Sequence, residues 1–218
     1  MLEKAFNIQD RFPSSLGKSL KWLMAASEEI LSGARKAMTE LDLEKAEKFI
    51  QYILDSRNKK IFVVGQGRSG FVGRAFALRL MNMGLTVYFL GETITPAAGT
   101  DDLIIAISGS GTTKITLTAS STAKEIGAQV VAVTSYPESP LGDLADLVMH
   151  IGGRTKLGWP TEEDYLVRQI LGESETLSPL GSIFENNCMV FLDSMVVELM
   201  HRLGKNEDEL RKLHATLE

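Results

Sequence analysis

Serine, threonine and glycine are concentrated in one short run, Ser108–Thr113, which reads Ser-Gly-Ser-Gly-Thr-Thr. The run directly follows the apolar segment 103–107 and leads into a segment with helical spacing. Glycines allow backbone N–H groups to approach a ligand closely, and hydroxyls at a helix N-terminus add donors beside the positive end of the helix dipole. This combination is typical of a site for a dianionic phosphate group, and it predicts one here.

A second glycine-rich run, Gly65–Gly70, follows the apolar segment 61–64 and contains Arg68 and Ser69. On an open parallel sheet, the loops after neighbouring strands meet in a crevice at the carboxyl edge, where α/β proteins bind their ligands. The two runs therefore predict one shared site. Arg68 and Ser69 would contact the phosphate or a sugar hydroxyl there, unless the run is only a tight turn with Arg68 in solvent.

The spacing Gly65-x-Gly67-x-x-Gly70 also matches the fingerprint of dinucleotide-binding folds, with Glu92 near the end of the next expected strand. An NAD-binding oxidoreductase is therefore an alternative. Against it, Glu92 lies somewhat beyond the usual spacing, and a dinucleotide fold gives no reason for the serine-rich run Ser108–Thr113.

The elements that would position these loops follow from hydrophobic periodicity. Apolar residues at helical spacing predict two helices over 15–41 and 42–55. Strands and helices then alternate, with strands expected at 61–64, 86–90, 103–107, 130–134 and 147–151 and helices at 69–83, 113–126 and from Pro140. This alternation predicts an α/β fold, a doubly wound five-stranded parallel sheet of flavodoxin-like order flanked by helices.

We expect one domain over residues 1–218. It would comprise N-terminal helices (1–57), an α/β core (58–151), a flexible loop (152–181) and C-terminal helices (182–218), the last with an apolar helix over 182–203 and a charged tail helix over 206–217. The segment 152–181 is polar and irregular, with prolines and several glycines. A loop of this length is typically functional, as a lid or an inter-subunit contact.

Composition and spacing argue against several other functions. With 23 basic and 28 acidic residues the formal charge is −5 and no basic block is present, so nucleic acid is not expected as a partner. The single cysteine, Cys188, lies in an apolar helical pattern that predicts a buried, inert thiol. Three scattered histidines form no ligand-spaced cluster, so no metal site is expected. No apolar run approaches membrane-spanning length and the N-terminus is charged, which predicts a cytoplasmic protein without membrane contact.

The serine-rich run has the form Ser-x-Ser-Gly-x-Thr, and by it the chain resembles the sugar isomerase (SIS) domain family. Further motifs extend the resemblance over nearly the whole chain and are similar to those of the 6-phospho-3-hexuloisomerases in that family. They are Gly67–Gly70, Arg79–Met81, Gly91–Thr93 with Thr95–Pro96, Ala106–Gly111, Pro179–Gly181 with Phe184–Glu185, and His214–Ala215 with Leu217–Glu218. Two positions depart from the family pattern, Thr112 where glutamate is common and Thr216 where asparagine is common.

The resemblance implies a ketose-phosphate isomerase that interconverts D-arabino-hex-3-ulose 6-phosphate and D-fructose 6-phosphate without cofactor or metal. The ketone would move from carbon 3 to carbon 2 through an enediol, which requires a base for the carbon-bound proton and an acid for the oxygens. Glu185 is the candidate base and His214 the candidate acid. The departures at Thr112 and Thr216 leave open which polar contacts are kept beside the reacting carbons.

Both candidates have a second interpretation. Ser182–Glu185 is also a capping box, in which the Glu185 carboxylate would only accept from the Ser182 N–H group. A helix N-terminus also lowers the pKa of a carboxyl group, which disfavours a base poised near neutrality. His214 would be a solvated tail histidine if it is not catalytic. If it is catalytic, the tail helix is expected to reach the crevice of a neighbouring subunit.

The expected substrate-binding residues lie at the ends of three strands: Gly67, Arg68, Ser69, Glu92, Thr93, Ser108, Ser110, Thr112 and Thr113. Among them Ser69, Ser108, Ser110 and Thr113 would hold the phosphate, whereas Glu92 and Thr93 would otherwise cap a turn before Pro96. The resemblance also implies a homo-oligomer, expected to be a tetramer, and a functional pairing with 3-hexulose-6-phosphate synthase. A non-catalytic sugar-phosphate sensor using the same loops stays an alternative.

Overall fold

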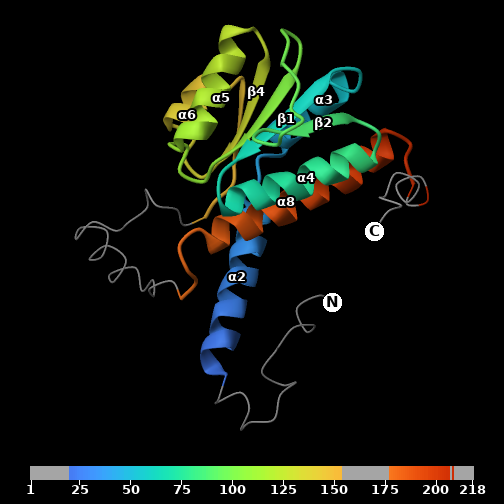
Figure 1. Cartoon of the computed structure of the whole chain (residues 1–218). Helices are drawn as coiled ribbons and strands as arrows, with labels where there is room; N and C mark the ends of the chain where they lie inside the picture. The colour runs from blue at the N-terminus through green and yellow to red at the C-terminus, as the bar shows by residue number, and fades with distance from the viewer. Residues whose placement is uncertain (1–19, 154–176, 207, 209–218) are drawn as a thin grey trace.

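The computed structural model describes residues 20–153, 177–206 and 208 (Figure 1). Most of the expected 152–181 loop and nearly all of the expected tail helix lie outside these residues. The elements are α2 (Lys21–Thr39), α3 (Leu43–Asp55), β1 (Lys60–Gly65), α4 (Arg68–Asn82), β2 (Thr86–Phe89), β3 (Leu103–Ile107), α5 (Lys114–Glu125), β4 (Gln129–Thr134), α6 (Pro140–Leu144), β5 (Leu147–His150) and α8 (Ser182–Arg202). The expected strands and the helices between them are confirmed to within a residue or two.

The five strands form one parallel sheet in the order β2-β1-β3-β4-β5. The flavodoxin-like order predicted from the alternation of strands and helices is therefore confirmed. All five residues of the central strand β3 are buried, which explains why its sequence is a continuous apolar run instead of an alternating one. The carboxyl ends of β1 and β3 are adjacent, because Gly65 and Ile107 are register partners.

Successive side chains of each strand point to opposite faces of the sheet and build two separate cores. On one face, Ile61 and Val63 pack with residues of α3, α4 and α8. On the other face, Phe62 and Val64 pack with residues of α5 and α6. Figure 1 shows the resulting three layers, with α5 and α6 on one side of the sheet and α4 and α8 on the other.

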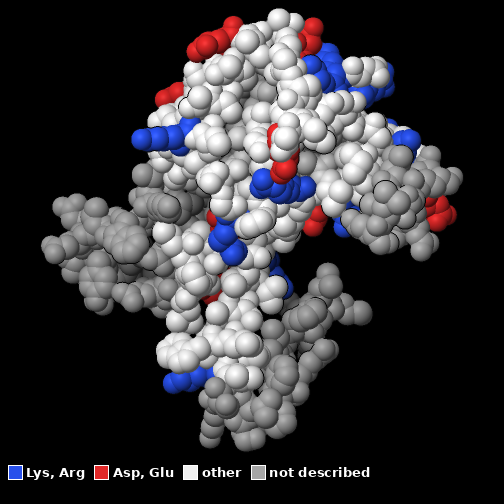
Figure 2. Space-filling view, viewed as in Figure 1, with Lys and Arg blue, Asp and Glu red and all other residues white. Residues whose placement is uncertain are grey.

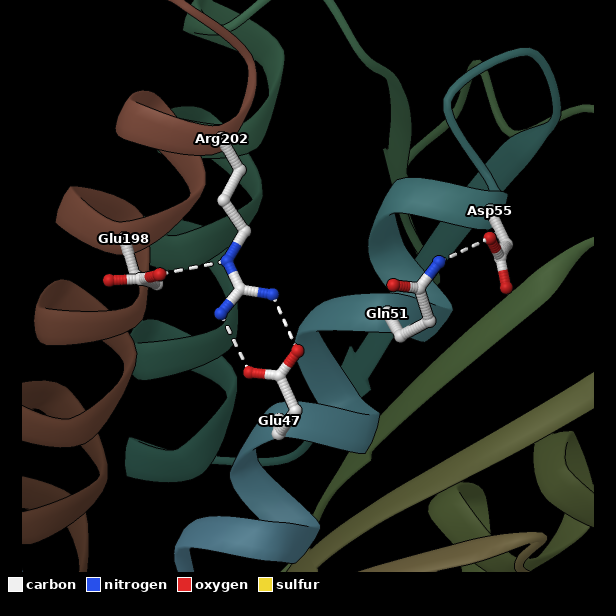
Figure 3. Close-up of polar contacts among 5 residues, drawn as sticks. All are labelled: Glu47, Gln51, Asp55, Glu198 and Arg202. Carbon is white, nitrogen blue, oxygen red and sulfur yellow. Dashed lines mark hydrogen bonds and ion pairs between the residues drawn. The ribbon is translucent and has the colours of Figure 1, made fainter.

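An ion pair between Arg202 and Glu47 joins the end of α8 to α3 (Figure 3). The two terminal guanidinium nitrogens of Arg202 donate to the two carboxylate oxygens of Glu47, each over 2.6 Å, and its Nε donates to Glu198 over 2.8 Å. Nearby, the rings of Phe49 and Phe191 lie with their centroids 6.3 Å apart. Apolar and polar contacts thus fix the orientation of α8 across the sheet.

Three expectations from composition and spacing concern the described residues directly. Cys188 is free and fully buried within the α8 core, and burial, with a smaller contribution from Glu185, raises the pKa of its thiol well above the usual value. The predicted burial of this thiol is confirmed. In the described part of the chain, no helix is long and apolar enough to cross a membrane, and no three His, Cys, Asp or Glu side chains are grouped so that they could hold a metal ion.

The buried face of α3 is expected to contribute strongly to stability. Ile53 is fully buried, so Ile53→Ala removes apolar contacts and leaves a cavity, and we expect it to lower the free energy of unfolding by about 2–5 kcal/mol. Ile94 is 86% exposed and is the matched control, for which the same substitution is expected to change stability by no more than about 0.5 kcal/mol. Urea unfolding measures both, and equal effects would contradict the packing described.

Candidate active site

A cavity of about 340 Å³ opens at the carboxyl edge of the sheet. Three chain segments form it: the loop from β1 to α4, the loop from β3 to α5, and the first turn of α8 with the residues just before it. The lining residues are Gln66, Gly67, Arg68, Ser69, Gly109, Ser110, Thr113, Leu180, Gly181, Phe184 and Glu185. The predicted meeting of the two glycine-rich runs with Glu185 is therefore observed in the structure.

Two helix N-termini border this cavity. Gly67 is the N-cap of α4 and Thr113 is the N-cap of α5, both residues line the cavity, and neither helix begins with a side-chain cap. The first-turn N–H groups of two helices, together with the exposed guanidinium of Arg68, therefore favour an anion at this place. A phosphate group fits this donor set.

The serine-rich loop divides its hydroxyl groups between lining the cavity and supporting the loop. Ser110 and Thr113 line the cavity. Ser108 is buried and does not line it; its hydroxyl lies 2.9 Å from the hydroxyl of Thr113 and holds that side chain. The exposed Thr112 donates to Ser110 Oγ, over 3.0 Å from its hydroxyl and 3.3 Å from its N–H group. In this structure Ser108 and Thr112 thus contact lining residues rather than line the cavity themselves.

Two glycines at the loop from β1 to α4, called the first loop below, are explained by close backbone packing. A Cβ atom built at Gly65 would lie 2.9 Å from the carbonyl oxygen of Ser69, and one built at Gly70 would lie 2.8 Å from the carbonyl oxygen of Gly65. The strand end and the first helical turn therefore touch through their backbones. The dinucleotide-like spacing follows from this tight turn, which places Gly67, Arg68 and Ser69 at the cavity.

Glu185 lies on the first turn of α8 and points toward the first loop. The N-cap of α8 is Gly181, without a side-chain cap, and the Ser182 N–H group donates to the carbonyl oxygen of Pro179 over 3.0 Å. The capping-box interpretation is therefore wrong, because Ser182 is already the first helical residue and its N–H group has a backbone acceptor. The Glu185 carboxylate instead accepts from Arg68 Nε over 3.4 Å, and only 12% of the side chain is exposed.

Burial raises the pKa of the Glu185 carboxyl group above its usual value. Hydrogen bonding and charge attraction from Arg68, and a hydrogen bond from Ser69, act in the opposite direction and only partly offset burial. The expectation that the helix N-terminus lowers this pKa is therefore not met, since loss of hydration outweighs the favourable contacts. A raised pKa makes Glu185 a stronger base, as a general base for a carbon-bound proton requires.

Gly181 leaves the space that the Glu185 carboxylate occupies. Its φ angle is +90°, and a Cβ atom built on it would lie 2.9 and 3.0 Å from the two carboxylate oxygens. Gly181, Leu180 and Phe184 line the cavity but were not among the expected site residues, and neither were Gln66 and Gly109. The motif Pro179–Gly181 with Phe184 contained the signal for three of these five residues.

Two expected residues at the end of β2, Glu92 and Thr93, also do not line the cavity. Glu92 accepts from Arg74 Nε over 3.0 Å, and the Arg74 guanidinium lies 3.9 Å from the centre of the Phe89 ring. Thr93 is exposed, and neither Glu92 nor Thr93 lines the cavity. Their contact with substrate stays a prediction. His214 lies outside the described residues.

Comparison with known proteins identifies the family to which the two glycine-rich loops belong. The family model "SIS domain" matches residues 54–156, which include both glycine-rich loops but not Glu185. The chain is 47% identical over 184 residues to an uncharacterised protein of Aeropyrum pernix, covering 84% of this chain and 86% of the relative. It is 35% identical over 190 residues to the 3-hexulose-6-phosphate isomerase of Bacillus subtilis, covering 87% of this chain and 96% of the relative.

A solved structure extends the likeness to three dimensions. The crystal structure of a hypothetical protein from Methanococcus jannaschii, from which a molecular function of 3-hexulose-6-phosphate isomerase was inferred, matches with a TM-score of 0.70 and 36% identity. The match covers 91% of this chain and all of that one. The chain belongs to the SIS domain family of sugar-phosphate isomerases, in the group that contains the 3-hexulose-6-phosphate isomerases.

The raised pKa of Glu185 has a consequence for stability. Because its folded-state pKa lies above the unfolded value, the carboxylate costs stability at high pH and nothing at low pH, where both states are protonated. We therefore expect Glu185→Gln to gain stability relative to the wild type as pH rises from below the unfolded pKa to above the folded pKa. Melting temperatures between pH 4 and 8 measure this. Asp193→Asn, an exposed carboxylate of α8, is the control, and a flat or reversed difference for Glu185→Gln would contradict the burial described.

Proposed function

We propose that this protein interconverts D-arabino-hex-3-ulose 6-phosphate and D-fructose 6-phosphate through an enediol intermediate. The observation that carries the proposal is the partly buried carboxylate of Glu185, which faces the same cavity as two helix N-termini suited to a phosphate group. The name of the Bacillus subtilis relative supports this choice of substrate.

The phosphate would bind where α4 and α5 begin. The hydroxyls of Ser110 and Thr113 and the first-turn N–H groups supply its donors, and the Ser69 hydroxyl would join them by turning from Glu185 to the phosphate. Ser108 contributes indirectly, through its hydroxyl contact with Thr113. Anchoring the substrate at its phosphate end leaves the carbon chain to extend toward α8, where Glu185 lies.

The reaction itself is a set of proton transfers. The Glu185 carboxylate takes the proton from carbon 2 of the 3-ketose, and the electron pair of that C–H bond forms the C2–C3 double bond of the enediol while O3 gains a proton. The same carboxyl group then returns its proton to carbon 3, and O2 loses its proton as the carbonyl forms at carbon 2. We assign the transfer between the two oxygens to His214. Arg68 beside Glu185 offsets the negative charge that develops on the substrate oxygens.

Replacing the base tests the proposal. We expect Glu185→Gln to lower kcat by about 10²- to 10⁴-fold with little change in KM, because the amide cannot accept the carbon-bound proton. Fructose 6-phosphate formation is measured while a synthase makes the 3-hexulose 6-phosphate from formaldehyde and ribulose 5-phosphate. Asp193→Asn is the matched control on the same helix and should retain wild-type turnover.

The other outcomes of this assay separate the alternatives. Normal turnover of Glu185→Gln would remove Glu185 as the base. A wild-type protein that binds the sugar phosphate without turnover would favour the non-catalytic sensor. The functional pairing with 3-hexulose-6-phosphate synthase and the cytoplasmic location expected from the sequence stay predictions.

We further propose that the protein acts as a homo-oligomer, a tetramer. Helices α4 and α8 lie side by side, and both carry large apolar side chains that are 40–70% exposed: Phe71, Leu78, Met81, Val190 and Val197. Figure 2 shows mostly uncharged surface on this side of the molecule, with separate groups of Lys, Arg, Asp and Glu side chains that include some over α4. A second copy covering this face would remove the apolar surface from water, and its tail helix could then bring His214 to the cavity.

A charge placed on this face is expected to disrupt assembly. Val197→Glu would bury an unpaired carboxylate between copies, so we expect light scattering to report a smaller particle than the wild type. Leu43→Glu is the control, because Leu43 is 74% exposed at the start of α3 and belongs to neither α4 nor α8. An unchanged particle mass for Val197→Glu would place the interface elsewhere.

A further inference from the structure

Helix α2 lies outside the part of the chain matched by the SIS family model, yet it packs against the helix that carries Glu185. Figure 1 shows α2 projecting from the body of the molecule and meeting α8 near the beginning of α8. The contacts at this meeting point involve two residues of α2 that are four positions apart, Glu29 and Gly33. Residues with this spacing lie on one helical face.

The carboxylate of Glu29 holds the chain just before α8. It accepts from the N–H group of Leu177 over 3.0 Å and from the N–H group of Ser178 over 2.7 Å. The hydroxyl of Ser178 donates to the same carboxylate, and the Ser178 residue is buried. A carboxylate with three donors from two consecutive residues fixes both the position and the direction of this segment.

One turn further along α2, Gly33 allows α8 to approach closely. A Cβ atom built on Gly33 would lie 3.1 Å from Ile183 Cγ2, which is tighter than an ordinary contact. Glu29 therefore binds the residues just before α8, and Gly33 contacts the first turn of α8. The two contacts act on opposite sides of Gly181, the N-cap of α8.

The segment held in this way forms one wall of the cavity and determines where Glu185 lies. Ser182 donates its N–H group to Pro179, and Glu185 donates its own N–H group to the carbonyl oxygen of Gly181 over 3.0 Å. The Glu185 carboxylate fits into the space left by Gly181. A shift of residues 177–181 would therefore displace the carboxylate relative to Arg68 and the phosphate loops.

We propose that Glu29 is a positioning residue for Glu185, acting through residues 177–181. This inference rests on the catalytic role proposed above for Glu185. The phosphate loops belong to other elements than residues 177–181, so loss of the Glu29 carboxylate should affect the proton transfer and leave phosphate binding in place. Misplacing a reacting group by about 1 Å can cost up to about 100-fold in rate.

The test compares Glu29→Gln with Glu28→Gln, which removes the same charge from the adjacent, exposed position. We expect Glu29→Gln to lower kcat by about 10- to 100-fold with KM changed by less than about twofold, and Glu28→Gln to resemble the wild type. Ser178→Ala should lower kcat in the wild type but not further in Glu29→Gln, since both act through one contact. Melting curves identify the temperature at which all variants are folded.

A second measurement needs no substrate. Hydrogen–deuterium exchange at the N–H groups of Ser182 and Glu185 should be faster in Glu29→Gln than in Glu28→Gln or the wild type. Equal exchange in the two variants would overturn the proposal, and so would faster exchange with an unchanged kcat. If the wild type fails to turn over the hexulose phosphate, the proposed function fails while the exchange experiment still decides whether Glu29 positions the start of α8.

Discussion

Burial of both faces of the parallel sheet is the constraint on which the rest of the structure depends. The strands that build the two cores are all parallel, so they all end at the same edge, and the loops after β1 and β3 meet there. The two cores on either side hold the sheet and its helices rigidly with respect to one another. The cavity exists because the two loops and the start of α8 converge on this edge.

The chemistry of the site depends on a balance at one carboxyl group. Helix α8 is part of the core along most of its length, with Phe184 and Cys188 fully buried, so Glu185 on the intervening turn has little access to water. Arg68, from a different element, supplies the compensating charge at the mouth of the cavity. Neither α8 nor the first loop alone would produce a carboxylate with a raised pKa beside an anion site, since each contributes one half of the arrangement.

Local patterns in the sequence predicted the strands and the cavity-lining loops correctly, because these features depend on interactions between residues close together in the chain. The apolar runs gave the strands, and the glycine and hydroxyl residues after 61–64 and 103–107 indicated the loops that line the cavity. The prediction of a capping box at Ser182–Glu185 was wrong. A capping box requires Ser182 to be the N-cap, whereas the N-cap of α8 is Gly181 and the Ser182 N–H group donates to Pro179. A capping box is defined by residue types, whereas the backbone hydrogen bonds that compete with it depend on the preceding turn.

The sequence by itself determined the fold class, the strand order and the two glycine-rich loops that line the cavity, since hydrophobic periodicity and loop chemistry act over a few neighbouring residues. Only the tertiary structure decided which hydroxyls line the cavity, that Glu92 pairs with Arg74, and that Glu185 faces Arg68. It also revealed the contact between Glu29 and Ser178, which are 149 positions apart. Contacts of this kind arise from the packing of helices across a sheet, and no local spacing encodes them.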